Sequence, residues 1–389
     1  MSLFDNKQLE FGSHTPTLTK VIETLGSLAF IFKNPKFSNL IIPCFNFVCM
    51  ELIPGLPNEV ALECLIRISF DQFPKAASVC RAWNGVIKQP EFLRRRKASG
   101  LTRPFIAMAQ SKDRLCGNQP VCRLTLFEPV KGRCYDVPPI PEMVESMPVF
   151  CRVVGIGPEL AVIGGCDRVT GEFLKSVFIY NFLSARWRRG ADMPGNERLF
   201  FGCAASEEEG MVVVAGGLDS DNNSLNSTLA YDMARDRWMS LPDMSYGRDQ
   251  CTCVFHRGKF HAIGSYYEVE ANQITETLDL VTRQWHLSDR ISDVMTLSYP
   301  AIYLEICGVI YIVNESRDVI ALQDGTWVVI TRVPDEICSV AYVTRWQGKM
   351  MVMGSRRAYM LEVKSKKWTK VEIPSEYCGY VLSSCCIDL

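Results

Sequence analysis

The chain has 389 residues, of which 48% are hydrophobic and 22% are charged, and its formal net charge is −1. This length exceeds what one hydrophobic core usually organises, so we expect two domains, or one small domain followed by a repeat array. The near-neutral charge excludes a protein that holds nucleic acid or an anionic membrane by overall electrostatic attraction.

Most of the 17 cysteines stand singly within apolar runs, such as LECLI and ASVCRAW, where cysteine behaves as a small hydrophobe. No C-x-x-C pair occurs and the count is odd, which argues against a disulfide framework. The N-terminus lacks the basic segment of a signal peptide, and its apolar stretches are too short to cross a bilayer. We expect an intracellular, soluble protein in the cytoplasm, the nucleus or both, with no membrane partner.

Residues 1–49 show no sustained periodicity and are expected to be a poorly structured N-terminal extension. Residues 50–98 have helical periodicity, and Pro57 suits the first position of a helix. Apolar side chains recur there at three-to-four spacing, namely Val60, Cys64, Leu65, Ile68, Ala76, Val79, Cys80, Trp83, Val86 and Ile87. Because the helical region is small, it cannot bury all of these apolar side chains internally. We expect the remaining ones to pack on the following domain or to form a docking surface for another chain.

Residues 101–389 carry short β-rich runs that repeat. The segments VFIYNFLSARW, TLAYDMARDRW, ETLDLVTRQW and YMLEVKSKKW share one plan, in which a strand ends in a large residue and Trp follows seven positions later. The tryptophans recur at intervals of 51, 47, 42 and 41 residues, at Trp187, Trp238, Trp285, Trp327 and Trp368. This period suits four-stranded propeller blades of the kelch type, because no Trp is followed by Asp as in WD repeats. We expect the tryptophans to fill space between blades.

Two copies follow an apolar strand that ends in paired glycines, Gly164-Gly165 and Gly216-Gly217, and FHAIGS and MVMGS are weaker versions. Glycine there allows a backbone geometry or a close approach that a Cβ would forbid. The count of copies predicts six blades, of which the first lacks its inner strand. The final segment GYVLSSCCIDL resembles the inner strands of other blades, so we expect it to complete blade one and close the ring.

These motifs carry a family resemblance. Residues 51–97 resemble an F-box, through Leu56-Pro57 and SVCRAWNGVI, and an F-box followed by kelch repeats resembles the plant F-box/kelch-repeat proteins, especially the KISS ME DEADLY clade. The predicted architecture is therefore a small all-α F-box domain over 50–98, followed by an all-β kelch propeller over 101–389. Members of the clade begin at or near a methionine like Met50, so we expect Met50 to be the initiator and residues 1–49 an upstream extension.

The resemblance implies a substrate adaptor of an SCF-type ubiquitin ligase. The F-box would dock on a Skp1-like protein and, through it, on cullin-1 and a RING subunit, while the propeller recruits the protein to be ubiquitinated. Clients in the related clade are phenylalanine ammonia-lyase and type-B response regulators of cytokinin signalling. A kelch scaffold without a ligase role is the alternative. Residues expected at the Skp1-facing surface, or supporting it, are Leu56, Pro57, Val60, Leu65, Val79, Cys80 and Trp83.

Kelch propellers usually bind partners through the loops that follow the second strand of each blade and those that lead into the first strand. Arginine and tyrosine suit a protein-binding face. Eight loop residues are candidates for client binding, with a structural role as the alternative for each: Asp167, Arg168, Arg198, Asp219, Asp221, Arg248, Tyr266 and Tyr267. Arg198 and Arg248 occupy matching places in successive blades, which makes a structural role a strong competitor for both.

Catalysis by the chain itself is disfavoured. A copper site of the kelch-oxidase kind needs histidines at fixed places, and His256 and His261 flank the turn expected at RGKF without an evident third ligand. The motif QDGTW occurs once and departs from the sialidase Asp-box, which has a residue between its Asp and Gly. The basic runs RRRK (94–97) and KSKKWTK (364–370) lack interleaved stacking aromatics and are expected to be solvated. We therefore expect no catalytic residue, no metal, no cofactor and no nucleic-acid partner.

Overall fold

The computed structural model describes residues 51–111, 121–268, 271, 274–288, 302–337, 340, 342–354 and 356–389. They form two compact units divided between Gln89 and Pro90, and each unit is described by itself. The extension expected over residues 1–49, and Met50, lie outside the described residues. No helix in the described ranges has the length and apolar character needed to cross a membrane.

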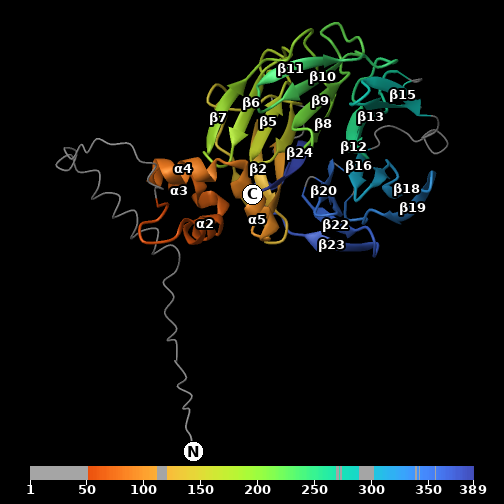
Figure 1. The fold of residues 1–389 in the computed structure, drawn as a ribbon. Helices are drawn as coiled ribbons and strands as arrows, with labels where there is room; N and C mark the ends of the chain where they lie inside the picture. Colours follow the sequence, from red (N-terminus) through yellow and green to blue (C-terminus); the bar gives the residue numbers. More distant parts are fainter. Residues whose placement is uncertain are drawn as a thin grey trace, which may run out of the picture. The chain divides into compact units, whose positions relative to one another are not determined.

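The first unit consists of short helices, as the periodicity predicts (Figure 1). Its elements are α2 (Asn58–Ile66), η2 (Phe70–Gln72), α3 (Phe73–Val79) and α4 (Arg81–Ile87). Pro57 lies immediately before α2 rather than inside it, because its ψ of 142° is extended while its φ of −53° already suits a helix. The core of the unit is formed by Ala61, Leu65, Ile66, Phe73, Trp83 and Ile87.

The second unit begins with α5 (Pro90–Ala98), so the F-box range expected from the sequence spans the division between the units. Its described strands form six antiparallel four-stranded sheets, the blades of a propeller (Figure 1). Blade one contains β24 (Tyr380–Asp388), β1 (Pro104–Ser111), β2 (Cys122–Glu128) and β3 (Arg133–Asp136). Blade two contains β4 (Arg152–Ile156), β5 (Glu159–Ile163), β6 (Val177–Asn181) and β7 (Arg186–Gly190). Blade three contains β8 (Gly202–Ser206), β9 (Met211–Ala215), β10 (Thr228–Asp232) and β11 (Arg237–Leu241).

The last three blades follow the same order from the innermost strand outwards. Blade four contains β12 (Thr252–His256), β13 (Lys259–Ile263), β14 (Thr275–Asp279) and β15 (Gln284–Ser288). Blade five contains β16 (Ile302–Ile306), β17 (Val309–Val313), β18 (Asp318–Gln323) and β19 (Thr326–Arg332). Blade six contains β20 (Tyr342–Trp346), β21 (Lys349–Met353), β22 (Ala358–Glu362) and β23 (Lys367–Val371). A short 3-10 helix, η4 (Ser375–Tyr377), leads from β23 into β24.

The propeller is closed by the strand expected from the sequence. β24 pairs antiparallel with β1, with Ala107 opposite Cys385, and it supplies the inner strand that blade one lacks. The strand is anchored at its end, where the backbone groups of Arg103 and Leu389 exchange two hydrogen bonds. Six blades and closure of blade one by the strand at 380–388 are therefore confirmed.

The periodic tryptophans join neighbouring blades. Each stands opposite the large residue that ends the preceding strand, as Tyr231 does for Trp238. The Trp238 indole N–H donates to Ala191 O, 2.8 Å away, just beyond the outer strand of the preceding blade. Equivalent bonds of 2.7 Å join Trp187 to Pro138 O and Trp285 to Pro242 O, and Trp368 donates to a threonine hydroxyl of blade five. The indole N–H of Trp327 has no hydrogen-bond partner among the described residues, but its ring packs against buried side chains of blades four and five.

The paired glycines are required by both conformation and space. Gly216 and Gly217 have φ values of 66° and 104°, which disfavour residues with a Cβ. A Cβ on Gly216 would lie 2.2 Å from Arg248 O, and one on Gly165 would lie 2.6 Å from Val149 O. The pairs therefore let the loop after the second strand approach the segment that enters its own blade, as at Gly165, or the segment that enters the next blade, as at Gly216.

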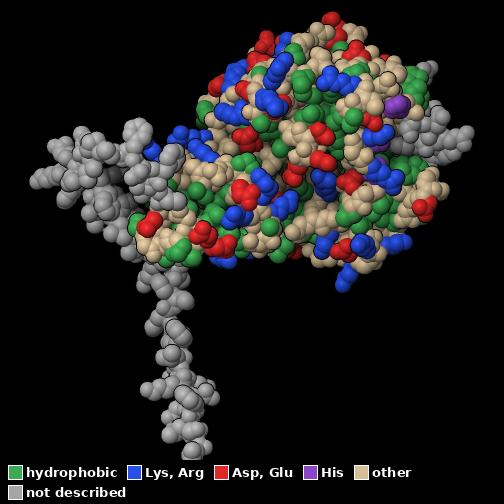
Figure 2. Space-filling model, viewed as in Figure 1, with side chains coloured by type: hydrophobic (Ala, Val, Ile, Leu, Met, Phe, Trp, Pro, Cys, Tyr) green, Lys and Arg blue, Asp and Glu red, His purple; other side chains and the backbone are tan. Residues whose placement is uncertain are grey.

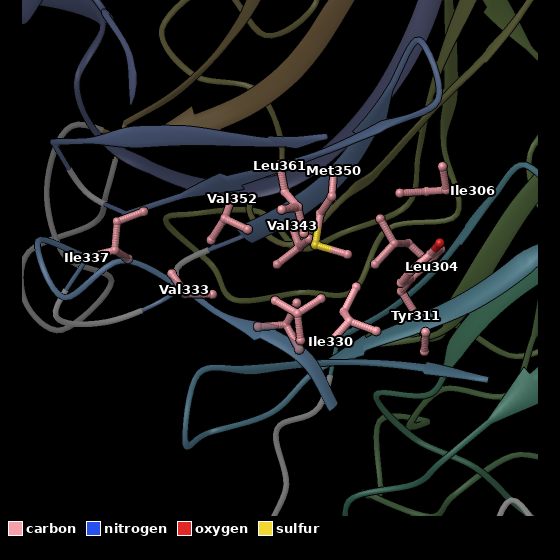
Figure 3. Close-up of a cluster of buried hydrophobic side chains, with 13 residues drawn as sticks. Leu304, Ile306, Tyr311, Ile330, Val333, Ile337, Val343, Met350, Val352 and Leu361 are labelled. Atoms are coloured by element: carbon pink, nitrogen blue, oxygen red, sulfur yellow. The ribbon is translucent and has the colours of Figure 1, made fainter. Parts of the chain in front are cut away.

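Apolar side chains fill the space between blades. Between blades five and six, Tyr311 and Ile330 face Val343 and Leu361 in one cluster of buried side chains (Figure 3). Because the second and third strands of a blade are buried along almost their whole length, as in β5 and β6, each blade packs against both neighbours. The result is a rigid ring whose loops project from its two ends.

Candidate protein-binding surfaces

The first candidate surface lies at the start of α2. Pro57 is exposed, Val60 is 46% exposed and Leu56 is half-buried. The preceding turn is fixed by two hydrogen bonds, from Leu52 N to Asn58 Oδ1 and from Leu56 N to Ile53 O. An ordered apolar patch that a single small unit leaves open to solvent is typical of a protein-binding site.

Other residues expected at this surface differ in exposure. Leu65 and Trp83 are 1% and 4% exposed and lie in the core, while Val79 is half-buried and Cys80 is exposed. The Trp83 indole donates to Leu52 O at 2.6 Å, and its backbone N–H donates to Cys80 Sγ at 3.5 Å, which caps α4. The buried pair thus supports the surface from beneath.

Cys64 adds to this surface, although it is absent from the set expected there from the sequence. It is exposed and lies four residues after Val60 on α2, which places both side chains on one helix face. The four-residue spacing of Val60 and Cys64 in the sequence is the signal that identifies Cys64 as a member of this surface.

The second candidate surface is one end of the propeller. In each blade the loop between the second and third strands, and the crossover from the fourth strand to the next blade, leave the ring at the same end, because consecutive strands are antiparallel. Backbone bridges join such a loop to the crossover that enters its own blade, as between Val149 and Cys166 and between Leu199 and Leu218. We call these loops together the loop face.

The carboxylates of Asp167 and Asp219 order their own loops. Asp167 Oδ1 accepts hydrogen bonds from Val169 N and Thr170 N, at 2.7 and 2.9 Å, and Asp219 Oδ1 accepts from the N–H groups of Asp221 and Asn223. The hydrogen bond from the Thr170 N–H lowers the pKa of Asp167, and that from the Asn223 side chain lowers the pKa of Asp219. Both residues therefore have a structural role as well as a place on the loop face.

The remaining loop-face candidates present side chains outwards. Asp221 is exposed, and Arg168 forms an ion pair of 2.9 Å with Glu145 from the neighbouring crossover. Tyr266 and Tyr267 are 51% and 62% exposed, and their rings meet edge to face with centroids 4.9 Å apart.

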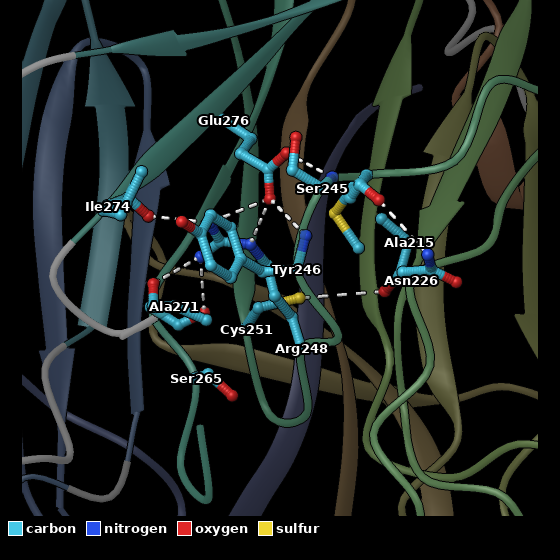
Figure 4. Close-up of polar contacts among 12 residues, drawn as sticks. Ala215, Asn226, Ser245, Tyr246, Arg248, Cys251, Ser265, Ala271, Ile274 and Glu276 are labelled. Carbon is cyan, nitrogen blue, oxygen red and sulfur yellow. Dashed lines mark hydrogen bonds and ion pairs between the residues drawn. The ribbon is translucent and has the colours of Figure 1, made fainter. Parts of the chain in front are cut away.

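Arg248 and Arg198 do not belong to an exposed surface, which corrects the expectation that they contact a client. Arg248 is fully buried and forms a 3.1 Å ion pair with the fully buried Glu276 (Figure 4). Its other N–H groups donate to the carbonyl oxygens of Gly264, Ala271 and Ile274. The guanidinium therefore holds together the loop between β13 and β14.

Arg198 is its counterpart one blade earlier and is 2% exposed. It donates to Gly216 O at 3.0 Å and to the backbone and hydroxyl oxygens of Ser227, and among the described residues no carboxylate accepts from it. Burial lowers the pKa of Arg198 to about 10, against the opposing charge of Asp243. The matching positions in the repeat thus reflect a shared structural role.

A central channel of 540 Å³ is lined by the inner strands of all six blades. Five cysteines reach it, namely Cys203, Cys251, Cys253, Cys385 and Cys386. Burial raises the pKa of Cys203 and of Cys386 to about 12, so these thiols stay protonated near neutral pH. Among the residues that the structure describes, no cluster of three or more histidine, cysteine or acidic side chains is arranged to hold a metal ion.

The basic run at 94–97 ends α5 and is balanced by acidic neighbours. Arg94 and Arg95 pair with Glu91, and Lys97 lies 3.4 Å from Asp388. On the face of the molecule seen in Figure 2, basic and acidic side chains are interspersed rather than gathered by sign. Neither feature provides the positive patch typical of nucleic-acid binding.

Comparisons with known proteins match both units. The F-box domain model matches residues 53–95, and the kelch motif model matches residues 147–194 and 201–245. An F-box/kelch-repeat protein of Arabidopsis thaliana is 39% identical over 361 residues, which cover 87% of this chain and 100% of the relative. The chain belongs to the F-box/kelch-repeat proteins.

A second Arabidopsis thaliana F-box/kelch-repeat protein is 36% identical over the same length and coverage. The solved structure of YjhT has a TM-score of 0.51 at 12% identity and covers 64% of this chain and 91% of its own, which supports the propeller fold alone. In an F-box/kelch-repeat protein, the F-box implies a Skp1 partner and the kelch propeller implies a bound client, as in an SCF-type substrate adaptor. Such adaptors are generally non-catalytic substrate receptors.

Proposed function

We propose that this F-box/kelch-repeat protein docks on a Skp1-like protein through the exposed start of α2, and so joins cullin-1 and a RING subunit. The observation that carries the proposal is the apolar patch of Leu56, Pro57 and Val60 within the F-box match. Such a patch gains free energy when a partner removes it from water, at about 25 cal/mol per Å² of apolar area. The chain would act in the cytoplasm, the nucleus or both.

The test is co-purification of the full chain with Skp1 and cullin-1. Leu56→Ala/Pro57→Ala should abolish Skp1 capture, because it removes apolar contact area and a fixed turn. Val281→Ala is the matched control, since Val281 is 92% exposed in the propeller unit and its change should leave capture intact. Undiminished Skp1 capture by the double variant would refute the docking surface. A folded wild-type chain that captures no Skp1 would instead favour a kelch scaffold.

We further propose that the loop face recruits the client for ubiquitination, and that the chain belongs to the KISS ME DEADLY clade. By that resemblance the client is phenylalanine ammonia-lyase or a type-B response regulator, and the protein restrains phenylpropanoid synthesis or cytokinin signalling. The purified Skp1 complex should capture one of these two proteins and shorten its half-life in cells when overexpressed. Unchanged half-lives of both would reject this client assignment.

A further inference from the structure

The loop face is acidic over blades two to four. The described loops there, within residues 164–176, 191–201, 216–227, 242–251 and 264–274, contain four basic residues. Two of these, Arg198 and Arg248, are buried. The other two are already ion-paired, Arg168 with Glu145 and Lys175 with Glu197. Acidic residues exceed these bases in the same loops and include Asp167, Glu172, Asp192, Glu197, Asp219, Asp221, Asp243, Asp249 and Glu268. Of these, Glu197 pairs with Lys175 and Asp192 pairs with Arg189 of β7. Because the whole chain is near neutral, the negative charge is local.

The exposed tyrosine pair stands within this acidic sector and is held in place. Asp249 Oδ1 accepts hydrogen bonds from the backbone N–H groups of Tyr266 and Tyr267, at 3.3 and 3.0 Å, and from the Ser265 hydroxyl at 2.9 Å. A side chain with few internal degrees of freedom on a fixed backbone loses little entropy on binding. The pair is therefore a preorganised contact site.

Asp249 places a buried carboxyl group directly beneath the pair. It is fully buried, and its Oδ2 has no hydrogen-bond partner among the described residues. The adjacent Arg248 forms its ion pair with Glu276 instead. Ser224 Oγ donates to Asp249 Oδ1 at 3.4 Å, which ties the blade-three loop carrying Asp219 and Asp221 to the same carboxylate.

We propose that Tyr266, Tyr267 and the acidic loops beside them bind a positively charged, arginine-containing segment of the client protein. An arginine guanidinium stacks on an aromatic ring and pairs with carboxylates at the same time, which a lysine ammonium does less well. The acidic loops attract such a segment and repel nucleic acid and acidic peptides. This inference rests on the proposed role of the propeller as client receptor and specifies the kind of client segment that the propeller binds.

The test uses the full chain, with and without Skp1, and measures the fluorescence anisotropy of a labelled peptide. The probe is a short fluorescein-labelled peptide of alternating arginine and serine, compared with lysine–serine and glutamate–serine peptides of equal length. We expect the arginine peptide to bind most tightly, the lysine peptide more weakly and the glutamate peptide not at all, with affinity falling as salt is raised.

Two variants locate the binding site, and a third is the matched control. Tyr266→Ala/Tyr267→Ala leaves the charge unchanged and should weaken arginine-peptide binding roughly tenfold. Asp221→Asn/Glu268→Gln should flatten the salt dependence. Glu208→Gln/Glu209→Gln removes the same charge from the exposed hairpin between β8 and β9, at the opposite end of the ring, and should change neither.

Equal binding of the wild type and the tyrosine variant would overturn the inference, as would loss of binding in the opposite-end control or tighter binding of the glutamate peptide. Skp1 capture is measured in parallel. A chain that captures Skp1 but not the arginine peptide refutes the acidic site alone, whereas a chain that binds the peptide but not Skp1 refutes the ligase role and leaves the site standing.

Discussion

Replacing Arg248 by methionine should destabilise the propeller far more than the same change at Arg198. Both side chains are buried and both hold a loop through backbone carbonyl oxygens. Arg248→Met in addition leaves the Glu276 carboxylate, which is fully buried, without its counter-charge. The two positions therefore separate the energy of a buried ion pair from that of buried hydrogen bonds.

The expected magnitudes follow from this difference. Removing one partner of a buried ion pair typically costs 3–5 kcal/mol, so about 4 kcal/mol is expected for Arg248→Met. Arg198→Met removes hydrogen bonds to Gly216 O and Ser227 without stranding a charge, and should cost about 2 kcal/mol. Arg248→Met/Glu276→Gln should recover roughly half of the larger loss, because the neutral amide oxygen can still accept from Ser245 N.

The measurement is urea unfolding of the full chain, followed by tryptophan fluorescence, with midpoints and slopes compared between variants. Equal slopes would show that the same structure unfolds in each case. The reasoning fails if Arg248→Met costs no more than Arg198→Met. It also fails if Glu276→Gln does not improve the stability of the Arg248→Met chain.

Three further predictions concern other features of the propeller. Burial lowers the pKa of His261 to about 4, so the unfolded state binds more protons below pH 6.5, and stability should fall by about 2 kcal/mol between pH 6.5 and 5. His261→Gln should remove this component, and identical pH profiles for the two chains would contradict it. Trp238→Phe deletes the indole bond to Ala191 O and should cost about 1 kcal/mol in urea unfolding, against no change for Val281→Ala; equal midpoints would count against the inter-blade bond. Deleting residues 380–389 unpairs β1 and should make the propeller sensitive to limited proteolysis, while a resistant fragment would show that the ring holds without β24.

The repeat itself could be predicted from the sequence because its signals are local. The seven-residue spacing from the strand end to Trp238 indicates the register of two neighbouring strands. The glycine pair at 216–217 indicates a left-handed backbone. Each signal spans only a few residues. The closing strand at 380–388 could be assigned because it resembles the other inner strands.

The roles of the loop residues could not be predicted in the same way. Arg248 looks like a surface arginine until Glu276, 28 positions later, is placed beside it by the fold. Likewise, Ser265 stands where two other blades have a second glycine, and only the structure shows that its hydroxyl engages Asp249. Burial and charge pairing across loops depend on tertiary distance, which periodicity does not encode.

Closure of blade one by β24 also orders events in time. The partner strand β1 is translated about 270 residues earlier than β24, and pairing strands so distant in sequence is slow because loop closure costs entropy before contacts form. The helical unit leaves the ribosome long before the ring can close. A chain stalled or cleaved before residue 380 would thus contain the folded helical unit while its propeller remains unclosed. A closed propeller therefore forms only after translation has reached β24.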